Sequence, residues 1–219
     1  MKSTIFNIHT NQEFTDVAIN VFKFQFNNNK VYRSFCDLLY VHPSDVTSLE
    51  QIPFLPIQFF KTKEVISSEK KIEETFTSSG TTGSITSKHF VTDISIYQES
   101  YLRGFTHFYG DIKDYTVLAL LPNYLERNGS SLVYMVNDLI QKSEKPASGF
   151  YLNNLSELAE KLTSLDKKGE KVLLIGVSFA LLDLIEQFSF SLKNTIVMET
   201  GGMKGRRKEI IRDELHFEN

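Results

Sequence analysis

The alternation of apolar strands with amphipathic helices from residue 115 onward constrains the fold more than any other feature of the sequence. Residues 171–177 (KVLLIGV) are a continuous apolar run with helical periodicity on either side. Strand-like and helical stretches alternate at 115–121, 130–141, 150–152, 155–165, 171–177, 179–188, 194–198 and 205–215. Strands that are apolar throughout are typical of parallel sheets covered on both faces. The sequence therefore predicts an α/β fold with a doubly wound, mainly parallel sheet and helices on both faces.

Two amphipathic helices are predicted near the N-terminus. Apolar residues recur at helical spacing in residues 11–24, for which Thr10 or Asn11 is the expected cap. A second helical pattern covers residues 31–39 and contains Cys36, the single cysteine of the chain. No histidine or helix N-terminus is evidently placed to activate this thiol, so we expect a buried structural cysteine. A single cysteine also excludes an internal disulfide and a cysteine-based metal site, and it fits a reducing cytoplasm.

Two of the helical patterns predict which side chains are buried. On the helix over 31–39, the expected apolar side carries Phe35, Leu38 and Leu39. A further helix is expected to be capped by Asp93 and closed by Gly110. Its expected inward side chains are Ile94, Tyr97, Leu102, Phe105 and Phe108.

An apolar, proline-containing segment follows the first two helices. Pro53 and Pro56 exclude a regular helix in residues 52–61 (IPFLPIQFFK), so we expect an extended stretch on the surface of a core. With this segment, residues 1–70 form one expected region, the N-terminal helices and the strap. Residues 71–219 form the other, the α/β core, and the two are expected to pack as one structural unit.

Charge and hydropathy exclude several classes of protein. The 219 residues suffice for one sizeable core, and the net charge of −3 provides no basic field for nucleic acid. No apolar run is long enough to span a bilayer, and residues 1–20 lack the pattern of a signal peptide. We therefore expect a cytoplasmic protein without a nucleic-acid or membrane partner.

The segment richest in hydroxyls and glycines, residues 75–88 (TFTSSGTTGSITSK), is the strongest candidate for a ligand site. Short strands are expected on either side, at 72–77 and 88–92, so the segment would be the loop of a hairpin. Glycines let backbone amides turn toward a ligand, hydroxyls add donors, and Lys88 adds a charge suited to phosphate oxygens. The order differs from that of a Walker A loop, G-x-x-x-x-G-K-[ST]. The alternative is a flexible linker, although linkers seldom end in Ser-Lys before a strand-like run.

Three predicted strand ends carry small or polar residues, at 122–127, 176–178 and 199–204. Ligands of doubly wound sheets bind at the carboxyl ends of strands, so these segments are candidate sites. At the first, Tyr124 could close one side of a pocket; the alternative is a plain turn into a helix, capped by Asn128 or Ser130.

The third strand end combines glycines with a run of cations. Gly201 and Gly202 would let the backbone approach a flat ligand closely. Lys204 follows the glycines directly. The cations of residues 206–208 fit a solvated helix face better than a ligand site.

The second strand end, Gly176-Val-Ser178, resembles the nucleophile elbow of serine hydrolases. It differs from the G-x-S-x-G pattern because Ala180 replaces the second glycine. A triad would also need an acid and a histidine downstream, where only Asp183, Asp213 and His216 remain. A serine hydrolase that uses Ser178 is therefore the weaker alternative.

Taken together, these segments resemble the acyl-protein synthetase (LuxE-like) branch of the adenylate-forming superfamily. This is the family of the bacterial luminescence fatty-acid ligase, and the phenylacetate–CoA ligases are its relatives. The resemblance covers nearly the whole chain, and the hydroxyl-rich loop is specific to the superfamily. The matching segments are IPFLPIQFFK (52–61), SSGTTGSITSK (78–88), LPNYLERNGSSLVYM (121–135), VLLIGVSFALLDL (172–184) and ETGGMKGRRKEI (199–210).

The resemblance implies that ATP and Mg²⁺ activate a carboxylic acid, expected to be a fatty acid, as an acyl-adenylate. The acyl group would then pass to the thiol of CoA or of an acceptor protein. Lys88 would be the catalytic residue. The implied nucleotide-binding residues are Ser78, Ser79, Gly80, Thr81, Thr82, Gly83, Ser87, Glu199, Thr200, Gly201 and Gly202. The implied substrate-pocket residues are Asn123, Tyr124, Ser130, Ser131, Gly176 and Ser178.

Other parts of the family pattern are expected beyond residue 219. They are the Glu that holds Mg²⁺, the ribose-binding Asp, the acyl-carrying Cys and the C-terminal domain with its catalytic Lys. We therefore expect an N-terminal portion that has no metal ligands of its own and is inactive without a C-terminal part or partner chain. The alternative is a catalytically inactive nucleotide-binding module that acts only through a partner chain.

Overall fold

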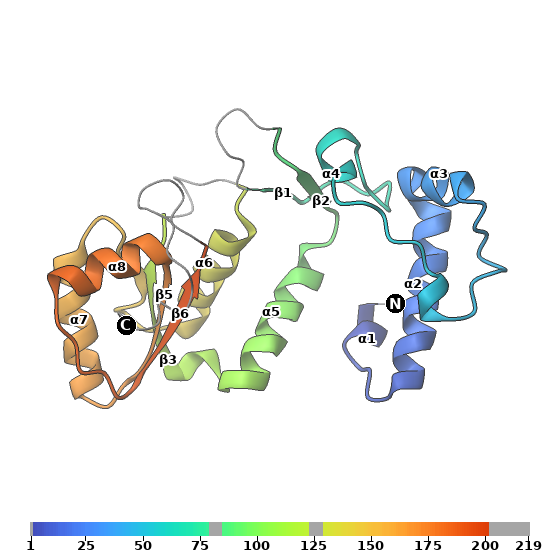
Figure 1. The fold of residues 1–219 in the computed structure, drawn as a ribbon. Coiled ribbons are helices and arrows are strands. Elements are labelled where there is room, and N and C mark those ends of the chain that lie inside the picture. Colours follow the sequence, from blue (N-terminus) through green and yellow to red (C-terminus); the bar gives the residue numbers. More distant parts are fainter. Residues whose placement is uncertain (1, 79–84, 123–128, 202–219) are drawn as a thin grey trace. The chain divides into compact units, whose positions relative to one another are not determined.

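The protein is described from a computed structural model, which covers residues 2–78, 85–122 and 129–201. The chain divides into two compact units, residues 1–102 and 103–219, and each is described by itself. Figure 1 shows the elements of both units along the chain.

The first unit consists of helices followed by a two-stranded hairpin. The helices are α1 (Lys2–Ile5), α2 (Asn11–Asn28), α3 (Lys30–Leu38), the 3-10 helix η1 (Leu49–Gln51) and α4 (Phe59–Thr62). The hairpin pairs β1 (Glu74–Thr77) with β2 (Lys88–Val91) in antiparallel register, as expected. Helix α5 (Ile94–Tyr109) follows and runs through the division at residue 102.

The two N-terminal helices form as the sequence predicts. Thr10 caps α2 in a capping box, in which the amide of Glu13 donates to Thr10 and a Glu13 carboxylate oxygen accepts from the amide of Thr10. Asn29 ends α2 and begins α3, so the two helices meet at one residue. Their shared core consists of Phe22, Phe26, Tyr32, Cys36 and Val46.

The boundary between the units differs from the expected one at residue 70. The hairpin clusters with the N-terminal segment because β2 contacts α4, where the ring of His89 stacks on that of Phe60 at 6.0 Å. The proline-containing segment also ends differently from expectation. Helix α4 begins at Phe59, since Pro56 restricts only the residues before it.

The predicted helix faces are partly wrong. In α3 the buried side chains are Tyr32 and Cys36, whereas Leu38 is 79% exposed, because the side with Tyr32 and Cys36 is the one that packs on α2. In α5 Phe105 is buried against Tyr115, but Phe108 is 76% exposed. Leu39 is 49% exposed as well, and all three residues lie at the C-terminal ends of their helices.

The second unit is an α/β sheet domain. After the 3-10 helix η2 (Ile112–Asp114), strands and helices alternate as β3 (Tyr115–Leu120), α6 (Ser131–Ser143), β4 (Gly149–Phe150), α7 (Leu155–Lys167), β5 (Lys171–Val177), α8 (Ser178–Gln187) and β6 (Thr195–Thr200). The sheet has the order β4-β3-β5-β6, and all its paired strands are parallel. The predicted doubly wound α/β fold is confirmed.

Helices cover both faces of this sheet. Figure 1 shows α7 and α8 on one side of the strands and α6 on the other. This follows from the strand order, because β3 connects outward to β4 while the chain then returns to β5 and β6 on the opposite side. Every residue of β3 is buried, and β5 is buried apart from Lys171, as expected for strands covered on both faces.

The strand order also creates a switch point between β3 and β5. From the carboxyl end of β3 the chain turns to one face, and from the carboxyl end of β5 it turns to the other. In doubly wound sheets the crevice for ligands lies at such a point.

Candidate functional site

The hydroxyl-rich segment leaves the hairpin through a closed stem. The amide of Ser78 donates to the carbonyl oxygen of Ser87 at 3.1 Å, and the amide of Ser87 donates to Oγ of Ser78 at 3.0 Å. Beside this stem, Thr77 and Lys88 are opposite one another in the strand register. The structure thus brings three predicted residues, Ser78, Ser87 and Lys88, to one end of the hairpin.

This end of the hairpin faces solvent. Lys88 and Ser78 are exposed, and Ser87 is half-buried. The hydroxyl of Ser78 accepts from Ser87, so its own proton remains available for a ligand. A lysine ammonium with three donors beside serine hydroxyls is a suitable group for anionic oxygens.

In the second unit, several predicted residues lie at the carboxyl ends of neighbouring strands. Gly176 and Ser178 end β5 and begin α8, and Glu199 and Thr200 end β6. Gly176 is the register partner of Glu199, so these residues lie side by side. Gly201 follows with a φ of 79°, a conformation that favours glycine.

Ser178 and Glu199 are joined by a direct hydrogen bond. Oγ of Ser178 donates to Oε1 of Glu199 at 2.6 Å. Ser178 is only 2% exposed, whereas Glu199 is half-buried. The pair therefore presents its carboxylate, and not its hydroxyl, to the outside.

This geometry argues against the hydrolase alternative. A catalytic serine needs an exposed Oγ and a histidine that takes its proton. Here the Ser178 hydroxyl is buried, and its proton is already donated to a carboxylate. Cys36 is also unsuited to nucleophilic chemistry, because it is fully buried and burial raises the pKa of its thiol.

Ser130 and Ser131, two of the predicted substrate-pocket residues, lie at the start of α6. Ser130 caps α6 and accepts from the amide of Val133 at 3.4 Å, which is one of the two caps expected there. Ser131 is exposed in the first turn of the same helix. The other predicted site residues lie outside the described part of the chain: Ser79, Gly80, Thr81, Thr82, Gly83, Asn123, Tyr124 and Gly202.

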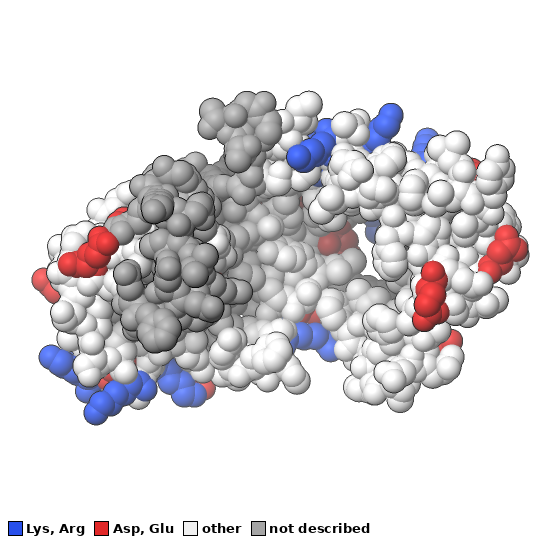
Figure 2. All heavy atoms as spheres, viewed as in Figure 1, with Lys and Arg blue, Asp and Glu red and all other residues white. Residues whose placement is uncertain are grey.

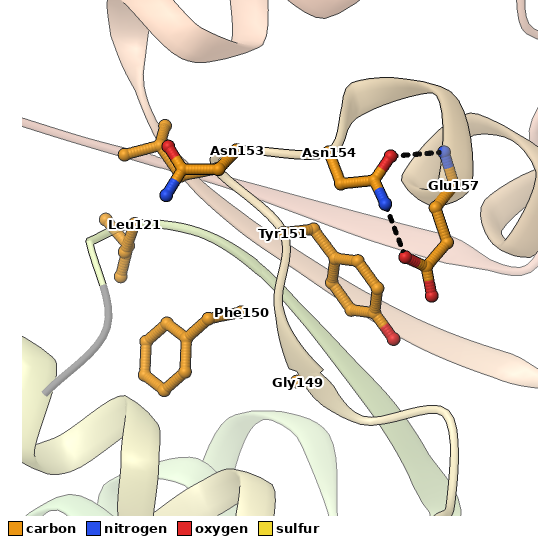
Figure 3. Close-up of a pocket in the computed structure, with 8 residues that line it drawn as sticks. Leu121, Gly149, Phe150, Tyr151, Asn153, Asn154 and Glu157 are labelled. Atoms are coloured by element: carbon orange, nitrogen blue, oxygen red, sulfur yellow. Dashed lines mark hydrogen bonds between the residues drawn. The ribbon is translucent and has the colours of Figure 1, made fainter.

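A fourth strand end, which the sequence did not single out, carries a pocket of about 280 Å³. In Figure 3 Leu121 and Phe150 lie on one side of it and Asn153 on another, while Asn154 and Glu157 are bonded to each other. The full lining is Leu121, Gly149, Phe150, Tyr151, Leu152, Asn153, Asn154 and Glu157. The available signal was the Asn-Asn pair between a weak strand and a helix, which marks both a cap and a strand end.

Tyr151 is fixed at the edge of this pocket. Its hydroxyl donates to the carbonyl oxygen of Ala147 at 2.6 Å and accepts from Nζ of Lys161 at 3.0 Å. Lys161 also pairs with Glu157 at 3.0 Å. These contacts fix the side of the pocket that Tyr151 and Glu157 form.

A comparison with known protein families assigns the N-terminal half of the chain to a family. Residues 7–108 match the model of the family described as acyl-protein synthetase, LuxE. This part of the chain is LuxE-like. The match includes the proline-containing segment and the whole β1–β2 hairpin with its hydroxyl-rich loop. The resemblance to the LuxE family is thus confirmed over these residues.

The LuxE match ends before β3, so the sheet of the second unit is not part of it. A comparison with curated proteins gave no match. Within residues 2–78, 85–122 and 129–201, no helix is long and apolar enough to cross a membrane. In Figure 2 the acidic and basic side chains of the visible face form separate small groups.

Proposed function

We propose that this LuxE-like chain binds ATP and a carboxylic acid, expected to be a fatty acid, and forms an acyl-adenylate. In this reaction a carboxylate oxygen attacks the α-phosphorus of ATP. The bond between the α-phosphorus and the bridging oxygen breaks, and pyrophosphate leaves with that oxygen. The acyl group would then pass to a thiol of an acceptor protein or of CoA, in the cytoplasm.

The observation that carries this proposal is the stem of the hairpin. Within the LuxE match, Ser78 and Ser87 close the stem, and Lys88 stands exposed beside it. The loop between the two serines contributes glycines and hydroxyls. Because adenylation is accelerated mainly by neutralising and aligning phosphates, a loop of this composition supports the proposal.

Mg²⁺ is part of the proposed reaction, but the described residues do not fit it. They contain no group of three His, Cys, Asp or Glu side chains that could hold a metal ion.

Isothermal titration with ATP and with adenosine tests the role of the hairpin. Lys88→Ala should weaken the binding of ATP by about 1–3 kcal/mol and leave adenosine unchanged, because only ATP offers anionic oxygens. Lys71→Ala is the matched control, since Lys71 is an exposed lysine of the same unit that lies before β1. It should change neither affinity.

Three outcomes would count against the proposal. Equal losses for ATP and adenosine would make Lys88 structural, and an absence of ATP binding by the wild type would overturn the nucleotide site. If ATP binds but no carboxylic acid is ever activated, the inactive nucleotide-binding module becomes the better description.

A further inference from the structure

The hairpin of the first unit carries a histidine to which nothing so far gives a role. His89 lies in β2, and its ring stacks on that of Phe60 in α4, with the centroids 6.0 Å and the planes 20° apart. Successive side chains of a strand point to opposite faces, so Ser87, directly before β2, and His89 share a face, with Cα atoms about 7 Å apart. A ligand that binds at Ser87 in the loop stem therefore comes within reach of the His89 ring.

The His89 ring has unused hydrogen-bonding capacity. Within residues 2–78, 85–122 and 129–201, neither of its ring nitrogens takes part in a hydrogen bond, and the residue is exposed. Stacking on Phe60 covers a face of the ring but not its edge, which carries both nitrogens. A neutral imidazole offers one N–H donor, and a protonated imidazole offers two.

The charges around His89 favour an anion. The two elements that pack against it each carry one charged residue, Lys61 on α4 and Glu74 on β1, and Lys88 precedes it on β2 itself. Two lysines and one glutamate give this end of the hairpin a positive balance. Partial burial alone lowers the pKa of His89 below its ordinary value, so the ring is neutral at pH 7 and can gain a charge when an anion binds.

We propose that His89 is a further phosphate-binding residue of the hairpin and that it takes up a proton from solvent when a polyphosphate binds. The imidazole gains one proton and one positive charge, and its N–H groups then donate to phosphate oxygens. The aromatic ring of Phe60 also favours a cation stacked on it. This inference rests on the proposed function and deepens it, because it makes ATP binding dependent on pH. A purely structural stack between α4 and β2 is the alternative to test.

Isothermal titration with ATP in buffers of different ionisation enthalpy measures the proton uptake, because the buffer that supplies the proton adds its own heat. At about pH 7 the wild type should take up more protons per ATP than His89→Gln, whose side chain is polar but does not titrate. From about pH 8 to about pH 6, the affinity of the wild type for ATP should rise about three- to tenfold more than that of His89→Gln. Comparison with the variant removes the protons that the phosphates themselves bind near pH 6.

His42→Gln is the matched control. His42 is another exposed histidine of the first unit, and its ring also contacts a phenylalanine, Phe26, with centroids 5.6 Å apart. This change should alter neither the ATP affinity nor the proton uptake. Tripolyphosphate and adenosine separate the two parts of ATP, because the effect of His89→Gln should persist with tripolyphosphate and be absent with adenosine.

The failure of this inference can be told apart from the failure of the proposed function. If Lys88→Ala weakens ATP binding while wild type and His89→Gln take up equal numbers of protons, only the inference is overturned. A lower melting temperature of His89→Gln with an unchanged pH profile would make the stack purely structural. NMR titration of the His89 ring in the wild type requires no variant to fold, and a pKa that tripolyphosphate does not raise would also overturn the inference. Failure of the wild type to bind ATP would overturn both.

Discussion

Gly176 stands where any side chain would collide with its neighbours. A Cβ at this position would lie 2.9 Å from Cγ of Leu181 and 3.0 Å from Cβ of Leu120. Both neighbours belong to the buried core of the second unit, so neither can move away freely. The absence of a side chain at Gly176 is therefore a packing requirement, apart from any role in a pocket.

We expect Gly176→Ala to lower the free energy of unfolding by about 1–3 kcal/mol, because it overpacks the contact between β5 and α8. Gly104→Ala is the control, since a Cβ there meets nothing within 4 Å and Gly104 lies inside α5. That change should raise the stability by about 0.5–1 kcal/mol through helix propensity. Urea unfolding of both variants measures the difference, and a neutral Gly176→Ala would contradict the close packing.

Asp166 joins the end of α7 to the segment before β6. Its carboxylate accepts from the amides of Lys193 at 3.0 Å and Asn194 at 2.8 Å, and from the hydroxyl of Thr195 at 2.8 Å. Burial alone would raise the pKa of Asp166. The amides of Asn194 and Lys193 and the Thr195 hydroxyl outweigh this, so the pKa lies below its ordinary value.

The lowered pKa makes the contribution of Asp166 dependent on pH. A carboxylate with a lower pKa in the folded state stabilises the protein above its unfolded pKa of about 3.9, and the stabilisation is lost as the pH falls through the folded value. Asp166→Asn should therefore lower the melting temperature most near pH 7 and less and less below about pH 4.

Asp114→Asn is the control for this pH series. Asp114 pairs with Lys171 at 3.2 Å, but both side chains are more than half exposed, so little change is expected at any pH. A melting-temperature difference for Asp166→Asn that stays constant from pH 7 to about pH 3 would show that the charge is not what stabilises the contact.

Among the elements, the junction of α2 and α3 depends on one side chain. Asn29 accepts from the amide of Tyr32 at 3.1 Å and donates to Oγ of Ser67 at 3.2 Å. It thereby caps α3 and attaches the helix pair to a segment nearly forty residues later. Asn29 is 4% exposed, so water cannot replace these contacts.

We expect Asn29→Ala to lower the free energy of unfolding by about 1–2 kcal/mol, as is typical of a lost cap. Asn27→Ala, two residues earlier, serves as control, because Asn27 is exposed on α2, and its effect should stay within about 0.5 kcal/mol. Denaturant unfolding monitored by circular dichroism compares the two. Similar effects at both positions would mean that the cap contributes nothing specific.

At this scale, periodicity predicted much of the described architecture. The limits expected for β5 agree with the structure residue for residue, because a continuous apolar run between polar ends has one buried register. The exposure of Phe108 and Leu38 could not be predicted, because periodicity identifies an apolar side of a helix but not how much of that side a neighbouring element covers. The contact of Ser178 with Glu199 was equally hidden, since it depends on which strands become neighbours.

The features of the two units were not equally predictable from the sequence. The first carries the LuxE match and the stem of the hydroxyl-rich loop, and both were anticipated from a local motif. The second carries the switch point, which follows from the strand order and needs the structure. The pocket beside Phe150 was not predicted, because β4 has only two residues and gives a weak strand pattern in the sequence.

The closed stem of Ser78 and Ser87 has a consequence for how this protein can change. The hydrogen bonds between Ser78 and Ser87 join the ends of the two strands, so they stabilise the hairpin at the base of its loop. Lengthening a closed loop is inexpensive, about 0.6 kcal/mol for each doubling of its length. Loops of different length and chemistry can therefore be accommodated on the same stem. The chemistry of the loop can then evolve, or be engineered, without redesign of the surrounding fold.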